Sequence, residues 1–265
     1  MFQLDPLLAV AVLAGLHIWC GRWRFIRSDR HSNWLSFSGG AAVAYVFMGL
    51  LPKLSLWQAE VLARRQAEPA VPRICEALGI VQWCGGLKNF LIYDIFLSAL
   101  AGLVFFYWVD WLVQHKRPPG GPGESQAPYR LFLLHIGIFA AYNVLIGYLI
   151  VHHVFPGKLV LMLLVIALGL HFLGINHSLW KIYREKFDVL GRWVFAVALF
   201  LGWLLGVLTE LAPAVYIGMY SFVAGGIIMN VFNEEMPHRH EARFWPFFFG
   251  VVGYSLLLIV IYAFK

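Results

Sequence analysis

Two polar residues at the centres of neighbouring apolar segments could do chemistry inside a membrane. Asn143 stands near the middle of residues 129–154, and His171 near the middle of residues 156–182. Polar side chains at membrane depth are costly and most often functional. An imidazole can ligate a metal ion or change its charge near neutral pH, and an amide oxygen can coordinate a cation. The structural alternative is a hydrogen bond that only joins two helices.

Further polar residues extend this candidate site. The predicted transport pathway comprises Asn143, His171, Asn176, His177, Tyr142 and Asn230. His171 and Asn143 are its candidate metal ligands, and no Asp or Glu stands in the middle of any predicted span. The site would therefore be neutral, and His171 would also suit a proton relay.

The remaining histidines lie nearer the ends of the apolar segments. His17 and His135, like the pathway candidate His177, stand where they can reach water at the inner interface. His152 and His153 form part of a turn, and the stretch 238–240 lies in a loop. We expect these histidines to be structural or solvated rather than metal-bound.

Composition predicts that the elements carrying these residues are membrane-spanning helices. Of the 265 residues, 61% are hydrophobic and 13% are charged, and the charges cluster between apolar runs. Each run has about 20 residues, the length that crosses a hydrocarbon core. We therefore expect an all-α polytopic membrane protein, surrounded by the lipid bilayer, with residues 1–265 as a single transmembrane domain. The chain has no nucleophile elbow, zinc-protease motif or phosphate loop, so it is not expected to be an enzyme.

Eight transmembrane helices follow from these runs. They are expected at Pro6–Trp23, Asn33–Lys53, Asn89–Val113, Tyr129–Val154, Pro156–Ile182, Val189–Leu211, Pro213–Asn233 and Trp245–Phe264. The tight link at residues 152–157 predicts that the fourth and fifth helices are antiparallel neighbours. Gly147 and Gly174, on the same faces as the two central polar residues, would let these helices approach closely.

Basic residues orient the predicted helices. The loops after the odd-numbered helices hold 13 of the 20 Lys and Arg residues: Arg22, Arg24, Arg27, Arg30, Lys116, Arg117, Arg130, Lys181, Arg184, Lys186, Arg192, Arg239 and Arg243. By the positive-inside rule these loops are cytoplasmic, so both termini should be extracytoplasmic. The expected location is the plasma (inner) membrane. Contact of these loops with anionic lipid explains the net charge of +6 without a nucleic-acid partner.

Two connecting segments have their own character. The extracytoplasmic loop 54–88 carries Cys75 and Cys84, which could close a disulfide or remain thiols. Gln58–Arg65, within this loop, could form a short interfacial helix. Residues 116–128 are rich in Pro and Gly, so we expect a flexible cytoplasmic linker.

Two stretches of the chain align with each other without gaps. Ser36–Pro52 and Ser221–Pro237 are identical at six of seventeen positions, including Gly40 with Gly225. The distribution of basic residues makes their helices run in opposite directions across the membrane. The match therefore predicts an inverted repeat that relates helices 1–3 to helices 6–8 around helices 4 and 5, as in secondary transporters. Chance similarity between two glycine-rich apolar segments is the alternative.

Together these features resemble the ZIP metal-ion transporters, thinly but across most of the chain. That family has a His-Asn-x-x-acid-Gly pattern on its fourth helix, where this chain has Tyr142-Asn143-Val144-Leu145-Ile146-Gly147. The fifth helix of the family has a His followed by Glu and Pro, of which His171 keeps only the His. Leu50-Leu51-Pro52 and Glu235-Met236-Pro237 are similar to the endings of the family's second and seventh helices. The resemblance implies a 3+2+3 helix arrangement and metal-ion transport.

The departures from the family pattern fall on its metal ligands. Tyr142 replaces the His and Ile146 replaces the acid, and the linker 116–128 lacks the histidines that many members have there. A divalent ion at the centre would meet only neutral groups, which leaves its charge uncompensated. We therefore expect a ZIP-like transporter with a degenerate central site. Its cargo would be a small cation or another small solute, with a divalent metal ion as a candidate substrate.

A second function is compatible with the same resemblance. The chain could be a non-transporting protein on the ZIP-like fold that acts as a sensor, a chaperone or a subunit of a membrane assembly. In either case its partner would be a second copy of the chain or another membrane protein.

Overall fold

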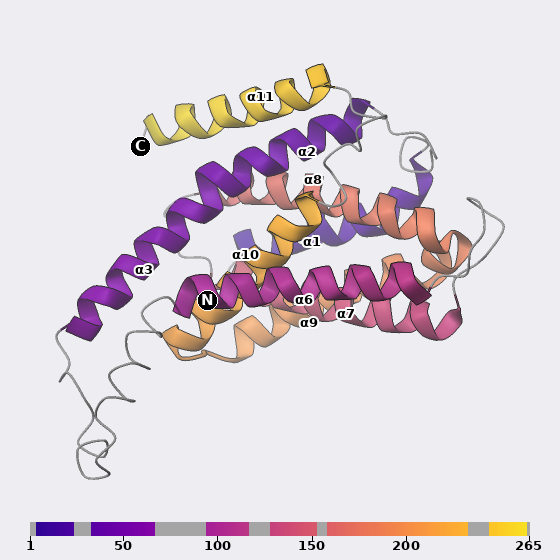
Figure 1. Ribbon diagram of the computed structural model, residues 1–265, viewed down its shortest axis with the longest axis horizontal. Helices are drawn as coiled ribbons and strands as arrows, with labels where there is room; N and C mark the ends of the chain where they lie inside the picture. The colour runs from indigo at the N-terminus through magenta and orange to yellow at the C-terminus, as the bar shows by residue number, and fades with distance from the viewer. Residues whose placement is uncertain are drawn as a thin grey trace, which may run out of the picture.

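The structure is a computed structural model that describes residues 4–23, 33–66, 94–116, 128–152, 158–232 and 244–263. Its helices are α1 (Leu4–Trp19), α2 (Asn33–Tyr45), α3 (Leu51–Gln66), α6 (Asp94–Lys116), α7 (Tyr129–Val151), α8 (Lys158–Tyr183), α9 (Arg192–Leu208), α10 (Pro213–Asn230) and α11 (Phe244–Ala263) (Figure 1). A 3-10 turn, Cys20–Arg22, extends α1, and π-helical turns Val46–Leu50 and Phe187–Gly191 precede α3 and α9. Cys75, Cys84 and the interior of the predicted 116–128 linker lie outside the described residues.

The helices confirm the predicted class. Seven helical stretches within the described ranges are long and apolar enough to cross a membrane, and they lie close to seven of the eight predicted spans. The remaining helix, α1, has 16 residues and is about 24 Å long, shorter than the roughly 30 Å of a hydrocarbon core. The described ranges are thus all-helical, as in a multi-pass membrane protein.

The second predicted span is longer than expected. A continuous helix runs from Asn33 to Gln66 through the π-helical turn Val46–Leu50. Pro52 lacks the N–H that a regular helix would use, and the wider turn just before it accommodates this loss without ending the helix. Residues 54–66 of the predicted 54–88 loop are therefore helical. The predicted interfacial helix Gln58–Arg65 is part of this long helix.

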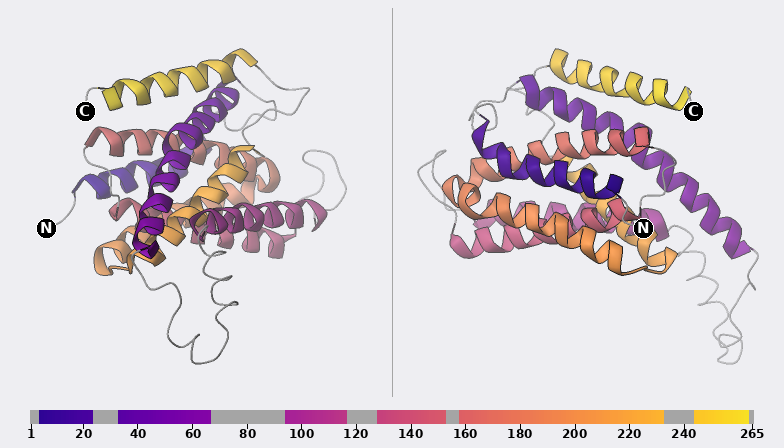
Figure 2. Two further views of the ribbon diagram at one scale, coloured as in Figure 1. Left: turned by 60° about the vertical axis from the view of Figure 1, so that its left-hand side comes forward. Right: turned by 180° about the vertical axis from the view of Figure 1, so that it is seen from behind.

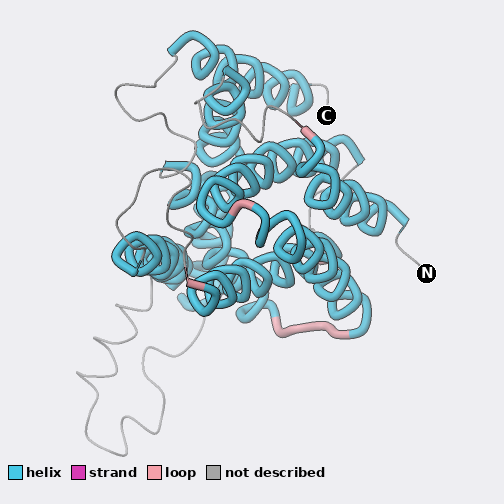
Figure 3. The backbone as a smooth tube through the Cα atoms, turned by 90° about the vertical axis from the view of Figure 1, so that its right-hand side faces the viewer, coloured by secondary structure: helices cyan, strands magenta, loops and turns pink. Residues whose placement is uncertain are grey.

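The helices pack mainly in pairs. α11 lies along one flank of the bundle, and its main neighbour is α2 (Figure 2). On the other side, α6 crosses α10 and α7 packs along α9. α1 packs against both α8 and α9, and α8 also contacts α2. The described residues are almost entirely helical, with no strand among them (Figure 3).

Glycine permits the close approach in three of these helix pairs. Where α2 meets α11, a Cβ on Gly40 would collide with the carbonyl of Phe247, and one on Gly250 with the carbonyl of Phe37. Such small residues let two backbones touch in a membrane. The corresponding contacts are Gly102 with Phe222 and Gly225 with Ala99 between α6 and α10, and Gly147 with Leu199 and Gly202 with Val144 between α7 and α9.

The prediction that α7 and α8 pack closely on each other is wrong. α7 packs on α9, whereas α8 packs on α1 and α2. The reason lies in Gly147, because its open face receives the carbonyl of Leu199 on α9 and cannot also face α8. α7 and α8 instead meet through long side chains such as Tyr142 and His171.

We expect Gly250→Ala to separate α11 from α2. The added methyl group meets backbone atoms of Phe37 and Ala41, which cannot rotate away. Overpacking of this kind costs about 1–3 kcal/mol. Thermal unfolding in detergent measures the loss. Gly253→Ala, on the same helix, is the matched control, because nothing lies within 4 Å of its added Cβ. Equal stability of the two variants would contradict the glycine contact.

Candidate functional site

A hydrogen-bonded cluster lies where α1, α7 and α8 meet. At its centre is His17 of α1, with Nδ1 2.9 Å from Oδ1 of Asn176 and Nε2 3.2 Å from Oδ1 of Asn143. Asn143 also donates from Nδ2 to the carbonyl of Phe139 at 2.8 Å. One imidazole thus joins two helices that are far from it in the sequence.

The bonds of Asn143 fix the tautomer of His17. Because Nδ2 of Asn143 donates to Phe139, its oxygen must face Nε2, so Nε2 carries the proton. In a neutral ring Nδ1 is then an acceptor, yet it faces the oxygen of Asn176. Nδ2 of Asn176 has no hydrogen-bond partner among the described residues. Turning this amide over lets Nδ2 donate to Nδ1, and we assign it so, because amide orientations are inferred from the network.

His171 lies beside this cluster with a partner of its own. The hydroxyl of Tyr142 is 3.2 Å from Nε2 of His171. Asn143 bonds to His17 and to Phe139, so the two predicted metal ligands do not bond to each other. Tyr142 and Asn143 are adjacent on α7 but make separate contacts. Tyr142 meets His171, and Asn143 meets His17.

The cluster is shut off from solvent. His17 and Asn176 are 0% exposed, and Asn143, Tyr142 and His171 are each 1% exposed. The ring centroid of Phe172 lies 4.6 Å from that of His17, and the ring centroid of Phe195 lies 5.3 Å from it, in edge contact. Aromatic rings thus pack beside polar groups in which His17 and Asn143 are fully hydrogen-bonded, whereas one end of the Asn176 amide has no partner among the described residues.

The other predicted pathway residues lie apart from the cluster. His177 is buried with its ring 6.2 Å from that of Trp34. Asn230, near the end of α10, is also buried, and its Nδ2 has no hydrogen-bond partner within the described part of the chain. His135 was expected to be structural and within reach of water; it is buried, with Nδ1 2.9 Å from the Tyr183 hydroxyl.

These residues do not fit a divalent metal ion. Within the described ranges, no group of three or more His, Cys, Asp or Glu side chains could hold one. The hydroxyl of Tyr142 faces the His171 nitrogen that would otherwise be available as a ligand. The imidazole and amide groups that meet here carry no negative charge to balance a divalent ion.

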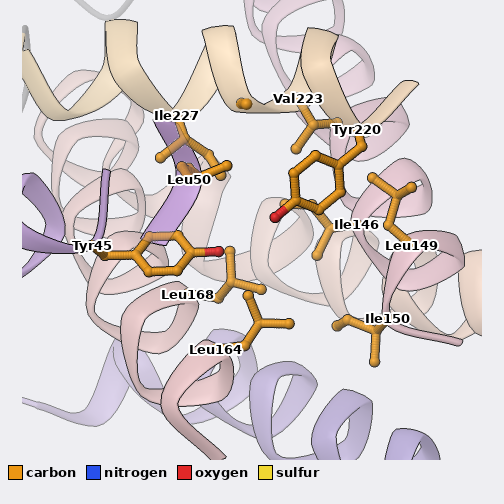
Figure 4. Close-up of a pocket in the computed structure, with 11 residues that line it drawn as sticks. Tyr45, Leu50, Ile146, Leu149, Ile150, Leu164, Leu168, Tyr220, Val223 and Ile227 are labelled. Carbon is orange, nitrogen blue, oxygen red and sulfur yellow. The ribbon is translucent and has the colours of Figure 1, made fainter. Parts of the chain in front are cut away.

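A small cavity lies next to this cluster. Its volume is about 30 Å³, and side chains from α2, α7, α8 and α10 line it. Ile146 lies one turn beyond Tyr142 on α7, and Leu168 lies one turn before His171 on α8, so the cavity reaches the level of the cluster. Tyr45 and Tyr220 point their hydroxyl groups toward each other across it (Figure 4).

Sequence reasoning underestimated His17. It was expected to reach water near the inner end of its helix, yet it stands at the centre of the cluster. Protein closes the end of α1, because Nη1 of Arg192 donates to the carbonyl of Ile18 at 3.2 Å and Cys20 donates to that of His17. A signal was present, since His17 is the single polar side chain between Pro6 and Trp19.

We expect His17→Phe to destabilise the protein while keeping the ring shape. The change leaves the amides of Asn143 and Asn176 without their partner in a dry core. The free energy of unfolding should fall by about 1–3 kcal/mol. Thermal or chemical unfolding in detergent measures it. His115→Phe on exposed α6 surface is the control and should cost little. If His17→Phe is as stable as the parent protein, the cluster does not stabilise the fold.

Comparison of the chain with known protein families, with curated proteins and with solved structures finds no match.

Proposed function

We propose that this chain is a membrane transporter built on a ZIP-like scaffold with an inverted repeat. The observation that carries the proposal is that the crossing of α2 with α11 recurs in the crossing of α10 with α6. Gly40 and Gly225 correspond in the alignment of Ser36–Pro52 with Ser221–Pro237. Each of them meets a backbone carbonyl of its partner helix.

The reciprocal contacts follow the same alignment. Phe37 and Phe222 are the second residues of the two aligned stretches. The carbonyl of Phe37 meets Gly250, and that of Phe222 meets Gly102. In both crossings, each helix therefore contributes a glycine and a carbonyl, at corresponding positions of the alignment. Two stretches that were similar by chance would have no reason to make the same backbone contacts.

Two irregular turns support the same relation. A π-helical turn begins at Val46 after α2, and α10 widens into a π-helical turn at Val231. These two residues also correspond in the alignment. We therefore relate α1, α2 and α6 to α9, α10 and α11 around α7 and α8, which makes α1 the first of eight spans. Transporters with such repeats bind their cargo near the membrane centre, between the repeats.

The proposed cargo is a small solute that is not held as a divalent ion at the central cluster. Neutral side chains can hydrogen-bond a small polar solute or pass a proton, whereas a divalent ion needs balancing charge. The proposed orientation has both termini on the extracytoplasmic side of a plasma (inner) membrane, which the distribution of basic residues supports.

One observation favours a second candidate function. Both ring nitrogens of His17 and both ends of the Asn143 amide have hydrogen-bond partners within the protein, and the ring of Phe172 packs beside them. Such a cluster suits a fixed scaffold as well as a closed transporter. The alternative is a non-transporting protein of the same fold that acts as a sensor, a chaperone or a subunit of a membrane assembly.

Flux into proteoliposomes tests the transport proposal. We expect uptake of at least one member of a panel of protons, monovalent and divalent cations and small uncharged solutes. His171→Ala and Asn143→Ala should slow that uptake about tenfold or more, because each removes a buried hydrogen bond worth about 1–3 kcal/mol. His115→Ala, on the exposed surface of α6, should leave the rate unchanged.

The stability of each variant is measured beside its flux, so that a loss of folding is not mistaken for a loss of transport. Liposomes that contain the parent protein but take up no member of the panel faster than empty liposomes would favour the second candidate. Unchanged flux in both folded variants would show that the central cluster does not take part in transport.

Restoring the family's ligands tests the ZIP-like scaffold separately from flux. We expect Tyr142→His combined with Ile146→Asp to create a zinc site with His171. Zinc at 100 times its dissociation constant then stabilises the folded variant by about 2.7 kcal/mol, and thermal unfolding with and without zinc measures the gain. The control, Tyr142→His with Leu145→Asp, places the acid on another face. A folded variant without a zinc response would contradict the scaffold.

A further inference from the structure

Two cavities are separated by a group of aromatic residues near the start of α10. The larger, about 500 Å³, lies between α3, α6 and α10 and is lined in part by Trp57 and Tyr216. The smaller, about 30 Å³, is the one that Tyr45 and Tyr220 line. The rings of Trp57 and Tyr220 stand between them, in edge contact with centroids 4.8 Å apart.

Lys53 holds this partition together. Its ammonium group lies 4.6 Å from the ring centroid of Trp57 and 5.1 Å from that of Tyr220. Its residue is 9% exposed, so the charge is largely withdrawn from water. Cation–π contacts are stronger in such surroundings. Because Lys53 and Trp57 belong to α3 and Tyr220 belongs to α10, the charge binds the two helices to each other.

The smaller cavity connects the partition with the membrane centre. Tyr220 forms one side of it next to the partition, and Tyr45 forms another (Figure 4). Ile146 and Leu168 also line it, and each is one helical turn from a residue of the Tyr142 and His171 contact. The partition thus borders the larger cavity on one side and, through the smaller cavity, leads toward the central cluster.

The helix that carries half of the partition has a built-in irregularity. The π-helical turn Val46–Leu50 separates Tyr45 from Lys53. Such turns interrupt the regular hydrogen-bond ladder and are frequent at functional sites. A bend at this turn would move Lys53 and Trp57 away from Tyr220 while Tyr45 stays with α2.

We infer that Lys53, Trp57 and Tyr220 form a gate between the larger cavity and the path to the central cluster. The gate is closed in this structure and opens when α3 bends away from α10. That a solute passes along this path rests on the proposed transport function, whereas the opening of the gate does not.

Accessibility of a buried cysteine tests the gate without any cargo. The reporter is Ala224→Cys, which lines the smaller cavity and is 0% exposed, in a chain whose Cys20, Cys75 and Cys84 are replaced by Ala. A small charged methanethiosulfonate reagent should modify it slowly in the parent protein in detergent. Trp57→Ala should raise the rate about 2- to 30-fold for each cation–π or ring interaction that the substitution removes. Lys53→Gln, which keeps most of the side chain, should raise it less.

Two controls separate gate opening from general loosening. Trp245→Ala removes an exposed Trp of α11 and should leave the rate unchanged. Ala14→Cys, which is buried on α1 away from the cavity, should stay protected in Trp57→Ala. Equal labelling at Ala14→Cys, or an unchanged rate at Ala224→Cys in both gate variants, would overturn the inference.

The labelling experiment tests the gate separately from the transport proposal. A chain that carries no solute but labels faster in the gate variants has the gate and not the function. A chain that transports but shows no change in labelling has the function and uses another entrance.

Discussion

Direct contact between backbones is the constraint on which this bundle depends. Apolar helices gain little by leaving lipid for one another, so their association relies on close packing and on hydrogen bonds between helices. Three helix pairs here approach until a glycine on each helix meets a carbonyl on the other. Once α7 is committed to α9 and α2 to α11, polar side chains help to hold α7 and α8 in place. His17 does so by bonding to both of them from α1.

Sequence alone predicts the helices well and their partners poorly. Apolar runs of spanning length are a local property, so the spans lie close to where they are expected. The extension to Gln66 was missed because Pro52 and Lys53 are typical of a helix end, while the wide turn before them depends on local packing. Partner choice is not local, because Gly147 could serve either neighbour and only the assembled bundle decides.

In the candidate site, too, the sequence predicts which residues matter but not which residues they contact. Asn143, Tyr142 and His171 were identified as important by depth and polarity, and all three lie at the centre of the bundle. Their bonding could not be predicted, because the partner of Asn143 is His17, 126 positions away in the chain. Lys53 was assigned to a helix end and was not recognised as a buried charge between two aromatic rings, because one of those rings belongs to α10.

The peripheral position of α11 has a consequence for how the protein is made. α11 packs mainly on α2, and the glycine face of α2 that receives it includes Gly40. The ribosome synthesises α11 after every other described helix, so for most of translation that face of α2 is covered by lipid alone. The newborn chain therefore has to hold a nearly complete bundle with one open seam. The seam closes only when α11 has left the insertion machinery and packs on α2.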